Sequence, residues 1–298
     1  MYDIIIIGAG PAGISASLYT QRANIKTLII YSDDLSALEK TSKIDNYYGF
    51  AKGIAGKDLY QEGIEQAKNL EVDIKKEEVT KIEIIEKGFL VVTEQDNYQS
   101  KAIILATGNK KNKPKIKGIE KFEGKGISYC AVCDGFFYRN RSIGVIGSGN
   151  YAITETNELI NIASNITILT NGEKAPEFRA DNVTIDTKKI EEIHGNQKVE
   201  EIEFSDHSKL KVDGIFVAQG VAGSTEFAKK LGAMTKQDKI VVNENMETNI
   251  PGLYACGDCT GGLLQISKAV YEGAKAGMQA IQYIRTQNLK SKNTNEIY

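Results

Sequence analysis

The chain opens with a dense apolar run that ends at a glycine. Residues 2–7, YDIIII, are almost all apolar and β-branched, which is typical of a strand buried in a parallel sheet. Gly8 interrupts the run, and the following residues predict a helix over Gly13–Ala23. A second apolar run, Thr27–Tyr31, lies at the distance expected of a strand–helix–strand unit. The N-terminal segment therefore predicts the start of a parallel α/β sheet.

The same pattern recurs near the middle of the chain. Ser142–Ile146 predicts a strand, Gly147–Gly149 a glycine turn and Tyr151–Ala163 a helix. Ile166–Leu169 predicts the next strand. The sequence therefore predicts an α/β fold with two Rossmann-like dinucleotide-binding domains.

Two segments mark the predicted domain boundaries. A strand over Lys101–Leu105 leads into Ala106, Thr107 and Gly108, and the lysine-rich stretch NKKNKPKIKG that follows is typical of a linker. A second crossing is expected near Asn243–Asn249. We therefore predict one discontinuous domain, residues 1–112 with 245–298, and one inserted domain, residues 113–244.

Composition and charge narrow the classes of partner. The 298 residues, of which 41% are hydrophobic, suffice for about two domains. Lys and Arg number 37 against 39 Asp and Glu, and no long basic run offers a surface for nucleic acid or for an anionic membrane. The N-terminal apolar run is too short for a membrane span and lacks the features of a signal peptide. We expect a cytoplasmic protein whose thiols are kept reduced.

The first glycine turn has the spacing of a dinucleotide-binding motif. Gly8 permits a tight turn, Gly10 lets backbone approach a pyrophosphate, and Gly13 lets the helix pack on the strand. The residues of this predicted site are Gly8, Gly10, Pro11, Ala12 and Gly13. An acid that binds ribose is expected at the end of the second strand, where the chain has Tyr31 and Ser32, with Asp33 just beyond as the candidate.

The second glycine turn is a Gly-x-Gly-x-x-Ala variant in the same context. Its predicted nicotinamide-site residues are Gly147, Gly149, Asn150 and Ala152. The strand after it ends in Thr170, Asn171 and Gly172, which supply neither the arginine that suits a 2′-phosphate nor the acid that suits a 2′-hydroxyl. Two interpretations stay open: a working NAD(P)H site, or a fold that kept its turn without holding a nucleotide tightly.

A third candidate site lies near the C-terminus. Gly257 and Asp258 follow a short apolar strand and precede a long helix predicted over Leu264–Ile284, whose N-terminal end can face a cofactor. The alternative is that Asp258 only caps that helix. The polar tail from Gln287 is expected to fray.

Two Cys-x-x-Cys pairs carry the candidate chemistry. Cys130 and Cys133 can close a small disulfide ring, and Asp134 follows at once as a candidate proton donor. Cys256 and Cys259 have the same spacing but lie about 120 residues away, which does not match a zinc ribbon. Three interpretations remain for the first pair: a redox pair, half of a zinc site, or two inert thiols. For the second pair, inert thiols are favoured.

Taken together and in this order, the motifs resemble the low-molecular-weight thioredoxin reductases. The resemblance runs from Met1 to about Ile284, and CAVCDGFFYRN is its most specific part. It implies a homodimeric FAD enzyme in which the discontinuous domain binds FAD and the inserted domain usually holds NADPH. It also implies that Cys133 lies beside the flavin, that Cys130 attacks thioredoxin, and that Asp134 is the acid. The FAD contacts that it implies include Asn46, Asp258 and Gln265, with Ala106, Thr107, Gly108 and Gly257 in the accompanying motifs.

The chain departs from that family where the electron donor binds. The stretch TNGEKAPEF replaces the usual His-Arg-Arg run, with Arg179 as the only nearby candidate arginine for a 2′-phosphate. The segment from Gly172 to Gly220 is shorter than usual by roughly one helix. The flavin loop reads LSALEKTSKIDN, and Leu264 stands where an arginine is usual.

These departures resemble the ferredoxin-linked flavin thioredoxin reductases. We therefore expect reduced ferredoxin as the donor, with NADPH or NADH as the alternatives. A flavin-binding redox sensor or electron carrier without turnover is the alternative of another class, and a zinc-stabilised interaction protein is a further one.

Overall fold

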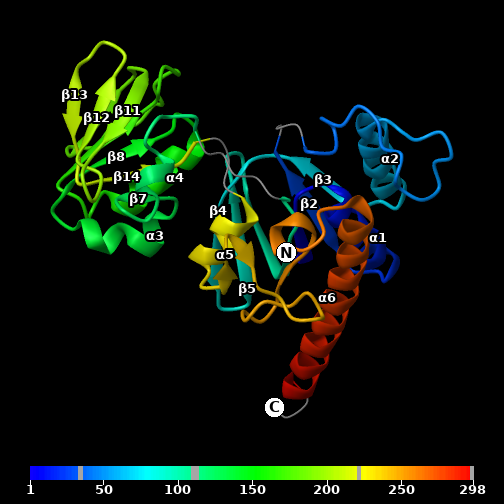
Figure 1. Cartoon of the computed structure of the whole chain (residues 1–298). Coiled ribbons are helices and arrows are strands. Elements are labelled where there is room, and N and C mark those ends of the chain that lie inside the picture. Colours follow the sequence, from blue (N-terminus) through cyan, green and yellow to red (C-terminus); the bar gives the residue numbers. More distant parts are fainter. Residues whose placement is uncertain (33–35, 109–113, 220–222, 296–298) are drawn as a thin grey trace. The chain divides into compact units, whose positions relative to one another are not determined.

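The computed structural model describes residues 1–32, 36–108, 114–219 and 223–295, with side chains up to Leu289. The chain folds into two compact units (Figure 1): residues 1–110 with 223–298 form the first, and residues 111–222 form the second. Asp33, the candidate ribose acid, lies outside the described residues. Within the described part, no helix is long and apolar enough to cross a membrane.

The first unit is built on a largely parallel sheet. Its described strands run in the order β3-β2-β1-β6-β5-β4, and β17 pairs with β6. β1 is parallel to both β2 and β6, and its residues Ile4–Ile6 are fully buried, as the apolar run predicts. The strands of this sheet are β1 (Tyr2–Ile7), β2 (Thr27–Tyr31), β3 (Asp73–Lys76), β4 (Val79–Ile85), β5 (Gly88–Thr93), β6 (Asn97–Leu105) and β17 (Leu253–Ala255). β15 (Thr235–Lys236) and β16 (Lys239–Ile240) form a separate antiparallel pair.

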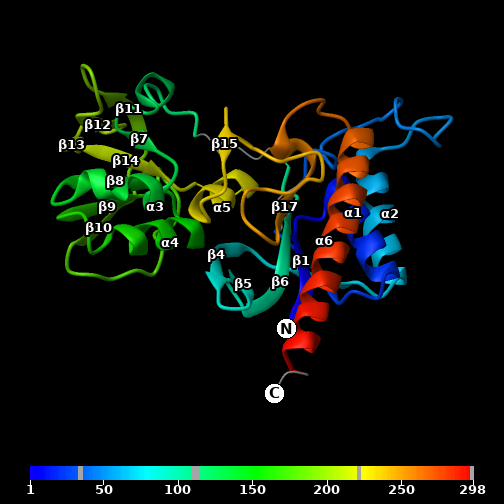
Figure 2. The same ribbon diagram turned by 90° about the horizontal axis from the view of Figure 1, so that it is seen from below.

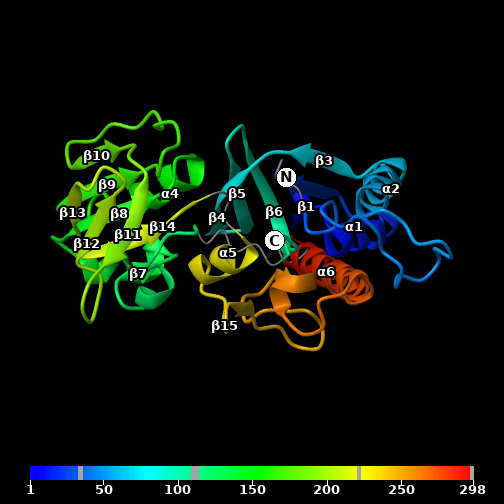
Figure 3. The same ribbon diagram turned by 45° about the horizontal axis from the view of Figure 1, so that its top comes forward.

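Helices α1 and α6 pack closely against each other in this unit. A Cβ at Gly273 would lie 2.0 Å from the carbonyl oxygen of Ala12, so only glycine permits this approach. Figures 2 and 3 show α6 running alongside α1. The helices are α1 (Pro11–Arg22), α2 (Gly56–Asn69), α5 (Ser224–Lys230) and α6 (Ile266–Asn295), with the 3₁₀ turn η3 (Gly257–Thr260).

The second unit has its own parallel sheet, in the order β10-β9-β8-β14-β7, and a separate antiparallel sheet of β11, β12 and β13. The predicted strand–turn–helix–strand pattern is present as β8, α4 and β9. Its strands are β7 (Ile127–Ser128), β8 (Ser142–Ile146), β9 (Asn165–Leu169), β10 (Val183–Asp186), β11 (Ile190–His194), β12 (Glu201–Phe204), β13 (Lys209–Lys211) and β14 (Gly214–Val217). Its helical segments are η1 (Glu120–Phe122), α3 (Ala131–Asp134), η2 (Gly135–Tyr138) and α4 (Asn150–Leu159). The α/β fold with two Rossmann-like units is thus confirmed.

Two sequence-based expectations are wrong. The first is the second domain boundary, because residues 223–244 belong to the first unit and not to the inserted one. Ser224, at the start of α5, exchanges hydrogen bonds with Thr107, and the backbone N–H of Met234 donates to Asn249 at 2.7 Å. These contacts attach the segment to the discontinuous unit.

The second error concerns the C-terminal tail, which is helical through Asn295 and does not fray from Gln287. No glycine or proline follows Gly277 to end the helix. In addition, Lys101 of β6 donates to Asn288 at 3.0 Å. These two features extend α6 beyond its apolar part.

Candidate redox and nucleotide sites

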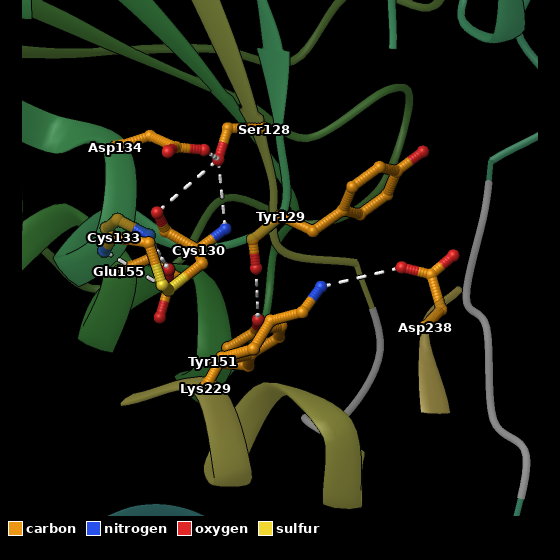
Figure 4. Close-up of a disulfide and its surroundings, with 10 residues drawn as sticks. Ser128, Tyr129, Cys130, Cys133, Asp134, Tyr151, Glu155, Lys229 and Asp238 are labelled. Carbon is orange, nitrogen blue, oxygen red and sulfur yellow. Dashed lines mark hydrogen bonds and ion pairs between the residues drawn. A yellow bond between two sulfur atoms is a disulfide. The ribbon is translucent and has the colours of Figure 1, made fainter. Parts of the chain in front are cut away.

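A disulfide joins Cys130 to Cys133 in the second unit (Figure 4). Cys130 is the N-cap residue of α3 and Cys133 lies within its single turn, which brings the two Cα atoms to 5.3 Å. The two thiols that the sequence paired are therefore joined in one ring. Cys130 is 4% exposed, whereas Cys133 is exposed to solvent.

The backbone of α3 favours a thiolate on the first cysteine. The N–H of Cys133 points at the sulfur of Cys130, with an N···S distance of 3.2 Å. A backbone N–H directed at a sulfur stabilises its negative charge once the disulfide is opened. Among the two sulfurs, Cys130 therefore has the environment of a nucleophile.

Asp134 is held next to this ring by a serine that the motif does not include. Ser128 donates to the carboxylate of Asp134 at 2.6 Å, and its hydroxyl oxygen accepts the N–H of Cys130 at 3.1 Å. Figure 4 shows Ser128 between the two. The hydroxyl thus connects the candidate proton donor to the backbone of the redox cysteine.

A buried glutamate also contacts the helical turn that contains the disulfide. Glu155 on α4 is 1% exposed, and its carboxylate accepts the N–H of Ala131 at 2.7 Å. This bond fixes the first turn of α3, directly after Cys130. Sequence reasoning missed both Ser128 and Glu155, because they lie outside the Cys-x-x-Cys spacing.

In the first unit, three of the predicted cofactor segments meet at the carboxyl edge of the sheet. Gly8 has φ +112°, and a Cβ there would lie 2.5 Å from the carbonyl oxygen of Ala106, so the first turn is pressed against the end of β6. Gly257, with φ +81°, lies against the Cβ of Ala12. A Cβ at Gly10 would meet only open space, which is the room that a pyrophosphate needs. The arrangement fits a dinucleotide such as FAD at the N-terminus of α1.

Two further pairs connect predicted cofactor residues across the sequence. The side-chain amide of Asn46 donates to Gln265 at 3.0 Å, although 219 residues separate them. The backbone N–H of Thr107 donates to the hydroxyl of Ser224 at 3.1 Å. Ser224 is a member of this group that no motif signalled, since it belongs to no glycine turn.

An ion pair braces the loop that holds Gly257 and Asp258. Lys268 and Glu272, one turn apart on α6, lie 3.0 Å from each other, and Glu272 accepts the N–H of Gly257 at 2.8 Å. Lys268 also donates to the carbonyl of Gly257 at 2.8 Å. The loop is therefore fixed by charged side chains from the helix that follows it.

The second cysteine pair lies in this braced loop and is not oxidised. Cys256 and Cys259 are free thiols with exposures of 0% and 1%. Burial raises the pKa of Cys259 to about 11 and raises that of Cys256 well above its ordinary value. The thiol of Cys259 donates to the carbonyl of Cys256 at 3.3 Å. These surroundings agree with the inert interpretation.

The second glycine turn keeps the backbone geometry of the first. A Cβ at Gly147 would lie 2.3 Å from the carbonyl oxygen of Ala218, just as Gly8 faces Ala106. Gly149, like Gly10, faces open space, and α4 begins at Asn150 with Ala152 fully buried behind it. The predicted residues thus form a complete strand–turn–helix unit.

Comparison with known proteins agrees with this arrangement. The sequence profile of the family described as pyridine nucleotide-disulphide oxidoreductase matches residues 2–273. A thioredoxin reductase of Listeria innocua is 36% identical, over 95% of this chain and 94% of that protein.

Solved structures give the same picture. An atypical thioredoxin reductase of Desulfovibrio vulgaris Hildenborough has a TM-score of 0.85 and 37% identity, covering 96% of this chain and 99% of that one. A ferredoxin-flavin thioredoxin reductase of Clostridium acetobutylicum has a TM-score of 0.67 and 34% identity, covering 96% and 98%.

Proposed function

The chain belongs to the pyridine nucleotide-disulphide oxidoreductase family, and we propose that it is an FAD enzyme that reduces the disulfide of thioredoxin or of a thioredoxin-like protein. The observation that carries the proposal is the Cys130–Cys133 disulfide with Asp134 held beside it through Ser128. A disulfide of this kind accepts two electrons and two protons and becomes a dithiol.

The cofactor residues act by binding and orientation. The first glycine turn and the N-terminus of α1 would hold the pyrophosphate of FAD, and Asn46, Asp258 and Gln265 would hold its flavin part. When bound, FAD supplies the electrons that open the disulfide. The Lys268–Glu272 ion pair holds the loop of Gly257 and Asp258 in position for this contact with FAD.

The thiols then act in sequence. The thiolate of Cys130, stabilised by the N–H of Cys133, attacks one sulfur of the partner's disulfide and forms a mixed disulfide with it. The partner's other sulfur leaves and takes a proton from Asp134, which took up that proton when the internal disulfide was reduced. Cys133, the thiol that by the resemblance would receive the electrons of FAD, attacks Cys130 and restores the internal disulfide. Its proton passes to the partner sulfur that leaves Cys130, so the partner is released as a dithiol.

For the electron donor we propose reduced ferredoxin in place of NADPH. The loop after β9 has no arginine at Thr170–Gly172, so the bidentate grip on a 2′-phosphate is missing. A relative at 34% identity is itself a ferredoxin-flavin thioredoxin reductase. NADH and NADPH are the alternative donors.

An anaerobic titration tests the donor. Purified FAD-loaded protein is titrated with reduced ferredoxin, NADH and NADPH while the absorbance of the flavin is followed. We expect bleaching by ferredoxin alone, and rapid bleaching by NADPH would contradict the proposed donor. Subsequent addition of oxidised thioredoxin should restore the absorbance over many turnovers, whereas one slow stoichiometric reaction would identify a redox sensor.

We further propose that the enzyme is a homodimer, as the resemblance to thioredoxin reductases implies. Sedimentation of the FAD-loaded protein at several concentrations measures this directly. A single species with the mass of one chain at micromolar concentration would contradict it.

A further inference from the structure

A carboxylate lies across the second glycine turn. The hydroxyl of Ser148, the residue between Gly147 and Gly149, donates a hydrogen bond to the carboxylate of Glu173. Glu173 follows β9, and β9 is parallel to β8 with Leu169 beside Ile146, so the ends of the two strands bring the turn and this loop together. In Rossmann folds, an acid at the end of this strand contacts the ribose of the bound nucleotide, and Glu173 lies four residues after β9 ends at Leu169.

The loop is built to hold Glu173 in that place. The hydroxyl of Thr170 donates to the carbonyl of Glu173 at 2.7 Å, and the N–H of Glu173 returns to the carbonyl of Thr170 at 3.2 Å. Asn171 and Gly172 both have left-handed backbone, with φ of +54° and +90°, which reverses the chain tightly. The side chain of Asn171 accepts the N–H of Ile190 at 2.8 Å and fixes the loop to β11.

The sign of the charge decides what this site accepts. A phosphate monoester carries a charge of about −1.5 to −2 at neutral pH, so a 2′-phosphate beside Glu173 meets a like charge and displaces the bond from Ser148. A 2′-hydroxyl can instead donate a hydrogen bond to the carboxylate.

We propose that Glu173 sets the nucleotide preference of the second glycine turn, rejecting 2′-phosphorylated nucleotides and accepting those with a free 2′-hydroxyl. This rests on the proposed function and deepens it, because it names the group at the second glycine turn that disfavours binding of NADPH, whichever donor reduces the flavin. Glu173 is the residue directly after Thr170–Gly172, the segment at the end of the strand where an acid is expected.

Equilibrium binding of 5′-AMP and 2′,5′-ADP, two probes that differ only in the 2′-phosphate, tests the inference. Calorimetric titration of the FAD-loaded protein should give 5′-AMP binding at least about tenfold tighter than 2′,5′-ADP. The neutral variant Glu173→Gln should narrow this ratio, and Glu173→Arg should invert it. Ser148→Ala, which releases the carboxylate, should also narrow it.

Glu177→Arg is the matched control, since it makes the same change of charge in an exposed part of the same loop and should leave the ratio unchanged. Retained FAD absorbance and circular dichroism identify folded variants. A ratio unaffected by the Glu173 variants, or absence of binding of both probes to the wild type and to every variant, would overturn the inference. The binding measurement involves neither thioredoxin nor electron transfer. It therefore tests the role of Glu173 even if the protein proves not to reduce thioredoxin.

Discussion

The two Cys-x-x-Cys pairs of this chain have the same spacing and opposite states. In each, the first cysteine is the N-cap of a one-turn helix, Cys130 for α3 and Cys256 for η3. Cys130 and Cys133 form a disulfide, whereas Cys256 and Cys259 are free and buried. The spacing therefore does not by itself make a redox pair.

The surroundings of the sulfurs explain the difference. In the first pair, a backbone N–H points at the sulfur of Cys130 and a carboxylate lies nearby through Ser128. In the second pair, Cys259 donates its own proton to a carbonyl, and burial raises the pKa of both thiols. Groups that stabilise a thiolate mark the pair that we propose to be reactive, whereas a carbonyl acceptor and burial of both thiols mark the pair that we propose to be inert.

The largest effect is expected from removing a sulfur of the reactive pair. Cys130→Ser and Cys133→Ser should each lower thioredoxin reduction to background, because neither thiol can complete the exchange alone. The flavin should remain reducible by the donor in both variants. Steady-state turnover with thioredoxin and anaerobic flavin bleaching measure the two properties separately.

Cys256→Ser and Cys259→Ser form the matched control and should retain most of the turnover. If either control abolishes turnover while FAD stays bound, the second pair is redox-active and the comparison fails. Cys133→Ser should also trap thioredoxin on Cys130 as a stable mixed disulfide, and trapping only in Cys130→Ser would exchange the two roles.

The ion pair between Lys268 and Glu272, which holds the loop of the second cysteine pair, is expected to stabilise the fold. Glu272→Ala should lower the free energy of unfolding of the first unit by roughly 3 kcal/mol, because it leaves Lys268 without its carboxylate in a mostly buried place. Urea unfolding, followed by the fluorescence of released FAD, measures it. Glu65→Ala, on the exposed part of α2, is the control and should change stability by less than about 0.5 kcal/mol. Equal effects of the two substitutions would mean that the ion pair does not brace the loop.

Titration of the buried thiols should make stability depend on alkaline pH. The folded pKa of Cys259 is about 11 against an ordinary value of 9.0, so its protonated form stabilises the fold fully below pH 9. This contribution, about 2–3 kcal/mol, is lost as pH rises from 9 towards 11, because the unfolded thiol ionises first. Urea unfolding at pH 8, 9, 10 and 11 should show a shallower decline for Cys259→Ala. The double variant Cys130→Ser/Cys133→Ser should decline like the wild type, since an oxidised pair has no thiol to titrate.

The sequence predicted the parts of this comparison that depend on local pattern. The apolar runs of β1 and β8, each followed by glycines, are a local pattern that predicts a buried strand and a tight turn. The domain boundary at residue 223 was missed because it depends on the contact between Ser224 and Thr107, which are 117 residues apart. Glu155 was missed for the same reason, because folding brings it to Ala131 from 24 residues away. Ser128 is only two residues from Cys130, but it was missed because it lies outside the Cys-x-x-Cys motif.

The smallest effect is expected at Ser128. Ser128→Ala should slow thioredoxin reduction by roughly three- to tenfold, or about 0.7–1.4 kcal/mol, the size of one ordinary hydrogen bond, because Asp134 loses the donor that orients it beside the disulfide. Ser128→Thr keeps the hydroxyl and should restore most of the rate, which loss of packing alone would not allow. Ser142→Ala, in the same unit but on β8, is the control and should leave the rate unchanged. Steady-state kinetics with thioredoxin, at a fixed concentration of electron donor, measures the rates of all three variants. Equal rates for Ser128→Ala and the wild type would mean that Ser128 is not one of the features that distinguish the two cysteine pairs.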